Sequence, residues 1–278
     1  MPSVGWAGHT LAPFKLSVDK VGARQACRLQ AMLGSIKRWF SGGNKPVEFT
    51  SMEQWAGTRG LTLRRVRDGE GCVFEGKLGT QEWRGEWGES QRGYLGSHEF
   101  RLIAELGLPK DLLVLLLNRK LMESLEKAVF EQFVEGVQTR IDTETPPEMR
   151  WLVMFPKLTG QELSGLRERF GGVSSIKPWM VQWLEGPLTK AITAMLPKMG
   201  EDDPVVMTIG KGRLTLRTAM LEPDPDQIAA WQKVFECAMR EARRAMTEWQ
   251  GSSTAGHSTQ PSSWSHSSLP REDPPPKA

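Results

Sequence analysis

Residues 83–94 read Trp83-Arg84-Gly85-Glu86-Trp87-Gly88-Glu89-Ser90-Gln91-Arg92-Gly93-Tyr94. This segment holds two of the chain's eleven tryptophans and its one tyrosine, separated by glycines and by charges of both signs. Successive side chains of a β-strand point to opposite faces, so Trp83 and Trp87 share one face, and Arg84 and Glu86 share the other. The alternation predicts a strand with packed tryptophans and solvated charges. A stacking platform for a ligand, a peptide or single-stranded nucleic acid is the alternative.

The residues around this strand predict an antiparallel meander. Apolar positions and turn residues indicate a turn at 68–71 and four strands, at 61–66, 72–78, 81–87 and 100–106. After Pro109, apolar residues recur at three- and four-residue steps from Leu112 to Phe133, which is the helical period. We therefore expect a long helix over this range that covers the tryptophan face of the meander.

A second group of elements follows Thr145-Pro146-Pro147, where the helical pattern breaks. Thr159 and Glu162 have the spacing of a capping box, and Gly186-Pro187 should kink or divide a helix because proline lacks a backbone donor. The predicted elements are a strand at 151–155, helices at 159–170 and 178–196, a hairpin of 205–209 with 213–218, and a helix from 224. The fold class is therefore α+β: an antiparallel meander packed against a long helix, followed by a second α+β unit.

Composition divides the chain into four segments. They are a basic N-terminal extension at 1–49, the sheet and helix at 50–145, the second unit at 148–249, and a tail at 250–278. The tail is rich in serine and proline and has too few large apolar residues to offset the entropy of ordering, so we expect it to be disordered. Met32 begins a short basic amphipathic segment, so whether Met1 or Met32 is the native start stays open. Whether the two folded halves form one domain or two also stays open.

The net charge of +3 is concentrated at the N-terminus. Residues 1–49 carry seven basic and two acidic side chains, whereas residues 50–249 carry 27 basic and 29 acidic ones. Clustered basic residues supply most of the attraction to phosphates, so nucleic acid is an unfavoured partner for the folded part. The three cysteines lack a CxxC spacing, and no apolar run is long enough to span a bilayer. The sequence predicts a soluble cytoplasmic protein with no transmembrane segment.

One histidine, His98, lies between residues 50 and 249, which limits the catalytic chemistry available. The sequence contains no nucleophile elbow, calcium loop, zinc-ligand spacing or phosphate-binding loop. We therefore expect no metal and no cofactor, and no catalytic residue can be named.

The binding candidates lie in the second half of the opening segment: Glu86, Glu89, Arg92 and Tyr94. The leading hypothesis is a non-catalytic interaction or regulatory module with a protein partner, because the tryptophan content is high and no catalytic constellation is present. The rival is a carboxylate-based hydrolase of a sugar or nucleotide, with Glu86, Glu89 and Arg92 in a loop beyond the strand. The third hypothesis is nucleic-acid binding through the strand arginines.

Overall fold

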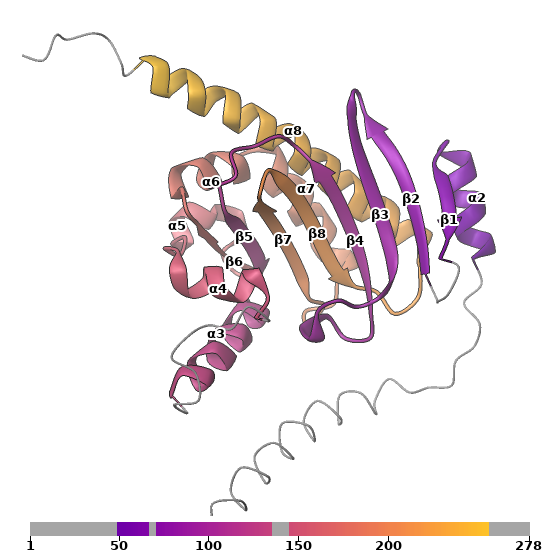
Figure 1. The fold of residues 1–278 in the computed structure, drawn as a ribbon, viewed down its shortest axis with the longest axis horizontal. Helices are drawn as coiled ribbons and strands as arrows, with labels where there is room; N and C mark the ends of the chain where they lie inside the picture. The colour runs from indigo at the N-terminus through magenta and orange to yellow at the C-terminus, as the bar shows by residue number, and fades with distance from the viewer. Residues whose placement is uncertain (1–48, 67–70, 135–144, 256–278) are drawn as a thin grey trace, which may run out of the picture.

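The computed structural model describes residues 49–66, 71–134 and 145–255. Within them the chain forms seven α-helices and one antiparallel sheet of eight strands, in the order β1-β2-β3-β4-β8-β7-β5-β6 (Figure 1). The strands are β1 (Thr62–Arg65), β2 (Gly71–Leu78), β3 (Gln81–Glu89), β4 (His98–Glu105), β5 (Val114–Asn118), β6 (Phe170–Ser174), β7 (Val205–Gly210) and β8 (Arg213–Ala219). The predicted α+β class is confirmed.

The helices cover the two faces of the sheet unequally. They are α2 (Thr50–Thr58), α3 (Arg119–Val134), α4 (Pro147–Met154), α5 (Gly160–Leu163), α6 (Lys177–Leu184), α7 (Pro187–Met195) and α8 (Pro225–Ala255). Helices α6, α7 and α8 pack on one face, behind the sheet in Figure 1, whereas α3 and α4 pack on the other face at the β5–β6 end. No described helix lies over the second face of β2, β3, β4 and β8. We call this side the uncovered face; it carries Glu75, Arg84, Glu86, Arg101 and Arg217.

The tryptophan face is packed, as the alternation predicts. Trp83 and Trp87 are 3% and 2% exposed and belong to the main core, between the sheet and α6–α8. Across β2 and β3, Gly76 stands opposite Trp83 and Gly85 stands opposite Phe74. A Cβ atom added at Gly85 would lie 2.3 Å from a ring carbon of Phe74, and one added at Gly76 would lie 2.3 Å from Trp83. The glycines therefore leave the space that the rings fill.

The helix predicted over 112–133 is wrong in its first part. Residues 114–118 form β5, inside the sheet between β7 and β6, and the helix α3 begins only at Arg119. A strand with both faces covered needs a continuous apolar run, and this one has it. Leu115 and Leu117 contact a second core beneath α3 and α4, while their neighbours join the main core. Consequently α3 lies on the face opposite the tryptophans, and α8 with α6 and α7 shares the tryptophans' core instead.

Turn and cap chemistry in the second group is confirmed. The capping box of Thr159 and Glu162 opens α5, and Gly186-Pro187 separates α6 from α7. The predicted hairpin is β7 and β8, with Lys211 and Gly212 in the left-handed region at φ 55° and 81°. The last predicted helix is α8.

Two elements of this group were predicted wrongly. The expected strand at 151–155 lies mainly in α4, whose first helical position is Pro147, where a missing backbone donor costs nothing. The helix expected at 159–170 is α-helical only over the single turn of α5; a 3₁₀-helix at Ser164–Leu166 and a turn follow, and β6 begins at Phe170. Gly171 and Gly172 are residues of β6: an added Cβ would lie 2.3 Å from Met122 Sδ at Gly171 or 2.5 Å from Met180 Cε at Gly172.

One sheet contains strands from both predicted units, because β4 pairs with β8 from Glu99↔Ala219 to Glu105↔Arg213. The domain boundary drawn at 145–148 stays a prediction. Helix α8 continues to Ala255, so the first residues of the expected tail are helical. The N-terminal extension up to residue 48 and the tail from 256 lie outside the described residues. Over the described ranges, no helix is both long enough and apolar enough to cross a membrane.

Candidate functional site

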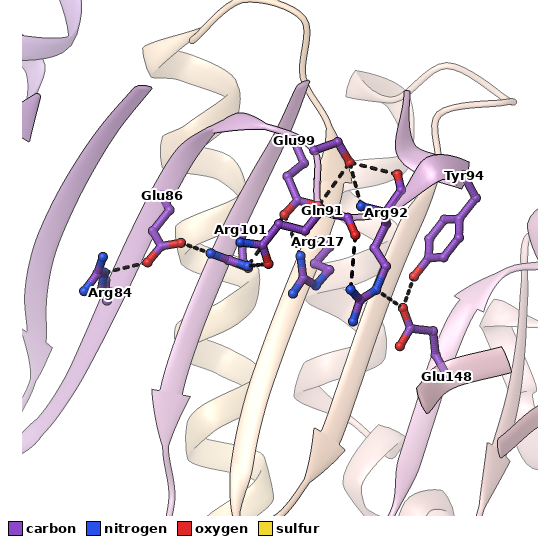
Figure 2. A network of polar contacts seen from close by, with 10 residues as sticks. Arg84, Glu86, Gln91, Arg92, Tyr94, Glu99, Arg101, Glu148 and Arg217 are labelled. Carbon is purple, nitrogen blue, oxygen red and sulfur yellow. Dashed lines mark hydrogen bonds and ion pairs between the residues drawn. The ribbon is translucent and has the colours of Figure 1, made fainter. Parts of the chain in front are cut away.

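A row of alternating charges crosses the uncovered face at one end of β3, β4 and β8 (Figure 2). Glu86 stands directly opposite Arg101 in the β3–β4 pair, and Arg101 stands opposite Arg217 in the β4–β8 pair. Side chains that stand opposite one another in an antiparallel pair are close enough to interact. The even-numbered residues of β3 thus meet the odd-numbered residues of β4 and β8 on one surface.

Two glutamates link the arginines of this row. Glu86 Oε1 lies 2.6 Å from Arg84 Nε, and its other oxygen accepts a hydrogen bond from Arg101 Nη2. Glu99 Oε1 lies 2.5 Å from Arg217 Nη1 and 3.8 Å from Arg101 Nη1. The result is a continuous series of ion pairs in the order Arg84, Glu86, Arg101, Glu99, Arg217.

The loop between β3 and β4 extends the row. Ser90 Oγ donates to the carbonyl of Arg92 at 2.8 Å and accepts from the Arg92 backbone N–H at 3.1 Å, which fixes a tight turn. Gln91 accepts a hydrogen bond from Arg101 through its side-chain oxygen, and its carbonyl accepts one from Arg92 Nη1 at 3.2 Å. The short 3₁₀-helix Gly93–Leu95 then presents Tyr94.

Glu148, from the first turn of α4, completes the arrangement. Its Oε1 accepts hydrogen bonds from Arg92 Nε and from the Tyr94 hydroxyl, and its side chain is 6% exposed. We call the ten residues the arginine–glutamate network: Arg84, Glu86, Ser90, Gln91, Arg92, Tyr94, Glu99, Arg101, Glu148 and Arg217. Sequence reasoning missed Glu148, because its partners lie more than fifty residues away and the segment around it was predicted as loop and strand.

Burial governs the pKa values of this network. It raises the pKa of Tyr94, and the charge of Glu148 and its hydrogen bond from the hydroxyl act in the same direction. Burial also lowers the pKa of Arg217, and the like charges of Arg101 and Arg92 add to that effect against the attraction of Glu99. For Arg92, burial opposes the charged form, but the hydrogen bond and charge of Glu148 outweigh it and raise the pKa.

The structure brings together three of the four predicted site residues. Glu86, Arg92 and Tyr94 all belong to the arginine–glutamate network. Glu89 does not, because it lies three residues after Glu86 on β3 and is exposed on the other side of the strand. Glu86, Glu89 and Arg92 therefore do not converge on one point, which is the arrangement that the hydrolase hypothesis needs.

A cavity of about 1260 Å³ adjoins the network at Arg84 and Glu86. Its wall includes Glu75 and Lys77 of β2 and Ile103 of β4, so both charged and apolar side chains line it. Among the described residues, no group of three or more histidine, cysteine or acidic side chains could hold a metal ion. His98 packs its ring against Trp87, with 5.1 Å between centroids and 12° between planes.

The chain was compared with family models, curated proteins and solved structures. None of the three comparisons finds a match. The site's own chemistry is therefore the basis for the functional conclusion.

Proposed function

We propose that this protein is a non-catalytic interaction module that binds a protein partner on the uncovered face. The proposal rests on one observation, which is that the carboxylates of the network are already paired with arginines. Glu86 and Glu99 lie on the uncovered face and Glu148 lies beside it on α4, and each of the three is ion-paired with arginine. A carboxylate that is already ion-paired with arginine fits a role in binding better than a role in catalysis.

The engaged oxygens support binding over acid–base catalysis. A general base needs a free lone pair within hydrogen-bonding reach of the proton that it removes. Both oxygens of Glu86 contact guanidinium groups, and one oxygen of Glu148 accepts from two donors at once. The hydrolase hypothesis would require these pairs to break before each turnover.

The energetic cost of the network also supports a role beyond stability. Glu99, Arg101 and Arg217 are 4%, 14% and 13% exposed, so most of their hydration is lost on folding. Ion pairs that bury their charges often contribute less than apolar side chains of similar size would at the same place. Perturbed, costly charge clusters gather at functional sites, although purely structural ones exist.

We also assign the protein to the cytoplasm. The assignment is supported by Cys72 and Cys237, which are free and buried in the described structure. A fractionation experiment with an antibody against the native protein tests it, and recovery outside the cytoplasmic fraction would contradict it.

Affinity capture with matched charge reversals tests the binding role. Arg84→Glu changes the network at its most exposed arginine, whereas Arg167→Glu changes an exposed arginine outside the uncovered face. We expect wild type and Arg167→Glu to retain the same partner. We expect the affinity of Arg84→Glu for that partner to be about tenfold lower, which corresponds to about 1.4 kcal/mol. The retained protein is then purified and titrated against each variant by calorimetry. Equal binding by all three would refute the proposed surface.

A further inference from the structure

Each of the four arginines of the network has a hydrogen-bond donor without a partner among the described residues, and Arg84 at the exposed end pairs only through Nε. Arg217 uses Nη1 for Glu99, and its Nε and Nη2 make no hydrogen bond to any residue in the described part of the chain. Arg92 uses Nε and Nη1, and its Nη2 is likewise without a partner among the described residues. The buried Nε of Arg101 has no hydrogen-bond partner there either. Three neighbouring guanidinium groups thus carry donors that nothing in the described chain satisfies.

Of these arginines, Arg92 and Arg217 extend from the same side of the sheet, and their guanidinium groups are neighbours in the view of Figure 2. Their mutual repulsion agrees with this placement, because the charges of Arg101 and Arg92 help burial to lower the pKa of Arg217. The positive charge at this point is therefore incompletely neutralised, even though Glu99 pairs with Arg217.

The charge count of the network leaves room for one anion. It contains four arginines and three glutamates, so it has one positive charge in excess. A single carboxylate would balance that excess. The planar guanidinium group also presents paired donors whose spacing matches the two oxygens of a carboxylate.

We propose that the surface between Arg92 and Arg217 binds a carboxylate group of an acidic peptide segment in the partner protein. This inference rests on the proposed function and names the chemistry by which the uncovered face recognises its partner. The carboxylate occupies the free Nη2 and Nε donors of Arg217 and the free Nη2 donor of Arg92. It comes from an acidic side chain or from a chain terminus, since both present the same group.

A phosphate fits the site less well than a carboxylate does. A phosphorylated side chain carries about −1.5 to −2 charges at neutral pH, more than the single excess charge of the network. Glu99 and Glu148 flank the two arginines and would repel the surplus charge. The same arithmetic disfavours a nucleic-acid backbone, which would bring several phosphates to a surface with one unbalanced positive charge.

Fluorescence anisotropy with short labelled peptides tests the inference on the full-length protein. The probes are a capped peptide of glutamate and glycine, its glutamine counterpart, a phosphoserine counterpart, and an uncharged glycine–serine peptide with a free C-terminal carboxylate. We expect wild type to bind the glutamate or the free-carboxylate peptide at least about tenfold more tightly than the glutamine one, as for hydrogen bonds to charged groups. The two carboxylate peptides distinguish a side chain from a chain terminus.

Substitution of arginine by lysine distinguishes recognition by the paired donors of a guanidinium group from attraction to any positive charge. Arg217→Lys keeps the charge and the contact with Glu99 but removes the paired donors, so we expect about tenfold weaker binding of the carboxylate peptide. Arg64→Lys is the control. Arg64 lies on β1 at the edge of the sheet and is ion-paired with Glu75 of β2. Three strands separate β1 from β8. Thermal melts and near-ultraviolet circular dichroism establish that both variants are folded.

Several results would overturn the inference. They are equal binding of the glutamate and glutamine peptides, tighter binding of the phosphoserine peptide, an equal loss in Arg64→Lys and Arg217→Lys, or no binding of any peptide by wild type. If the peptides fail while Arg84→Glu still loses the captured partner, the interaction module stands and only its carboxylate chemistry is wrong. If both experiments fail, the proposed function fails with it.

Discussion

The two faces of strand β3 differ as much as any two regions of this molecule. Trp83 and Trp87 point to one face and are almost fully buried, whereas Arg84 and Glu86 point to the other and keep 51% and 19% of their side-chain surface exposed. The buried face stabilises the fold through apolar contact, and the uncovered face carries charge at a cost in hydration. Because the side chains of a strand alternate, β3 thus contributes one face to the core and the other to the proposed recognition surface.

The largest expected effect comes from removing a side chain of the buried face. Trp87→Ala deletes a fully buried indole and the hydrogen bond from its Nε1 to the Met220 carbonyl, which measures 2.9 Å. We expect the free energy of unfolding to fall by about 3–5 kcal/mol in urea titrations. Trp87→Phe is the control: it keeps an aromatic ring but loses the hydrogen bond and part of the indole volume, at a smaller cost of about 1–3 kcal/mol. Loss of partner binding without loss of stability would break the division between the faces.

A smaller effect should follow from a change at the covered end of the network. Glu148→Gln keeps the shape of the side chain but removes the charge that pairs with Arg92 and accepts from Tyr94. We expect a loss of about 1–3 kcal/mol in the free energy of unfolding, because a partly buried guanidinium loses its counter-ion. Glu168→Gln, at an exposed pair with Arg167, should leave stability unchanged.

The single tyrosine makes the same variant readable by spectroscopy. Because the chain has one tyrosine, its tyrosinate absorbance reports on Tyr94 alone. Burial and Glu148 raise the Tyr94 pKa, so wild type should ionise well above the ordinary value of about 10. In Glu148→Gln the repulsion between phenolate and carboxylate is gone, and the titration should shift to lower pH. An unchanged titration curve would show that Glu148 does not contact the Tyr94 hydroxyl in solution.

The raised pKa of Tyr94 also makes stability depend on pH, and the sign follows from linkage. The unfolded chain loses the tyrosine proton at about pH 10, before the folded chain does, so the stabilising effect is complete below that pH. It is lost as the pH rises from there toward the folded pKa. Wild type should therefore lose stability more steeply above about pH 10 than Tyr94→Phe, which has no proton to lose.

The smallest effect is expected on the exposed end of the network. Arg84→Gln removes a half-exposed guanidinium that is paired with Glu86. Exposed ion pairs contribute little, so the free energy of unfolding should change by less than about 0.5 kcal/mol. A loss comparable to that of Glu148→Gln would mean that the uncovered face stabilises the fold as well.

Local patterns in the sequence predicted much of the fold. The alternation of residues 83–87, the capping box at Thr159 and the break at Gly186-Pro187 are each determined by neighbours a few residues apart. The apolar run at 112–117 fits the helical spacing of the residues that follow it, but a continuous apolar run fits a buried strand equally well. Its position inside the sheet depends on β6 and β7, which lie far along the chain.

The candidate site was predicted less completely for the same reason. Glu86, Arg92 and Tyr94 could be named because they stand in one segment. Glu148 and Arg217 reach the network from α4 and β8, and their arrival depends on how the sheet is ordered. Pairings of this kind leave no spacing in the sequence, so the sequence does not indicate that Arg217 and Glu148 belong to the site.

The glycines opposite Phe74 and Trp83 also restrict how β2 and β3 can align. Sliding one strand by a single residue would turn every side chain to the opposite face and would bring a residue with a Cβ against each ring. Gly76 and Gly85 thus help to fix the register of the two strands, since only one register places each ring opposite a residue without a side chain. Because that pairing sets which side Arg84 and Glu86 occupy, two residues without side chains determine where the charges of the proposed binding surface lie.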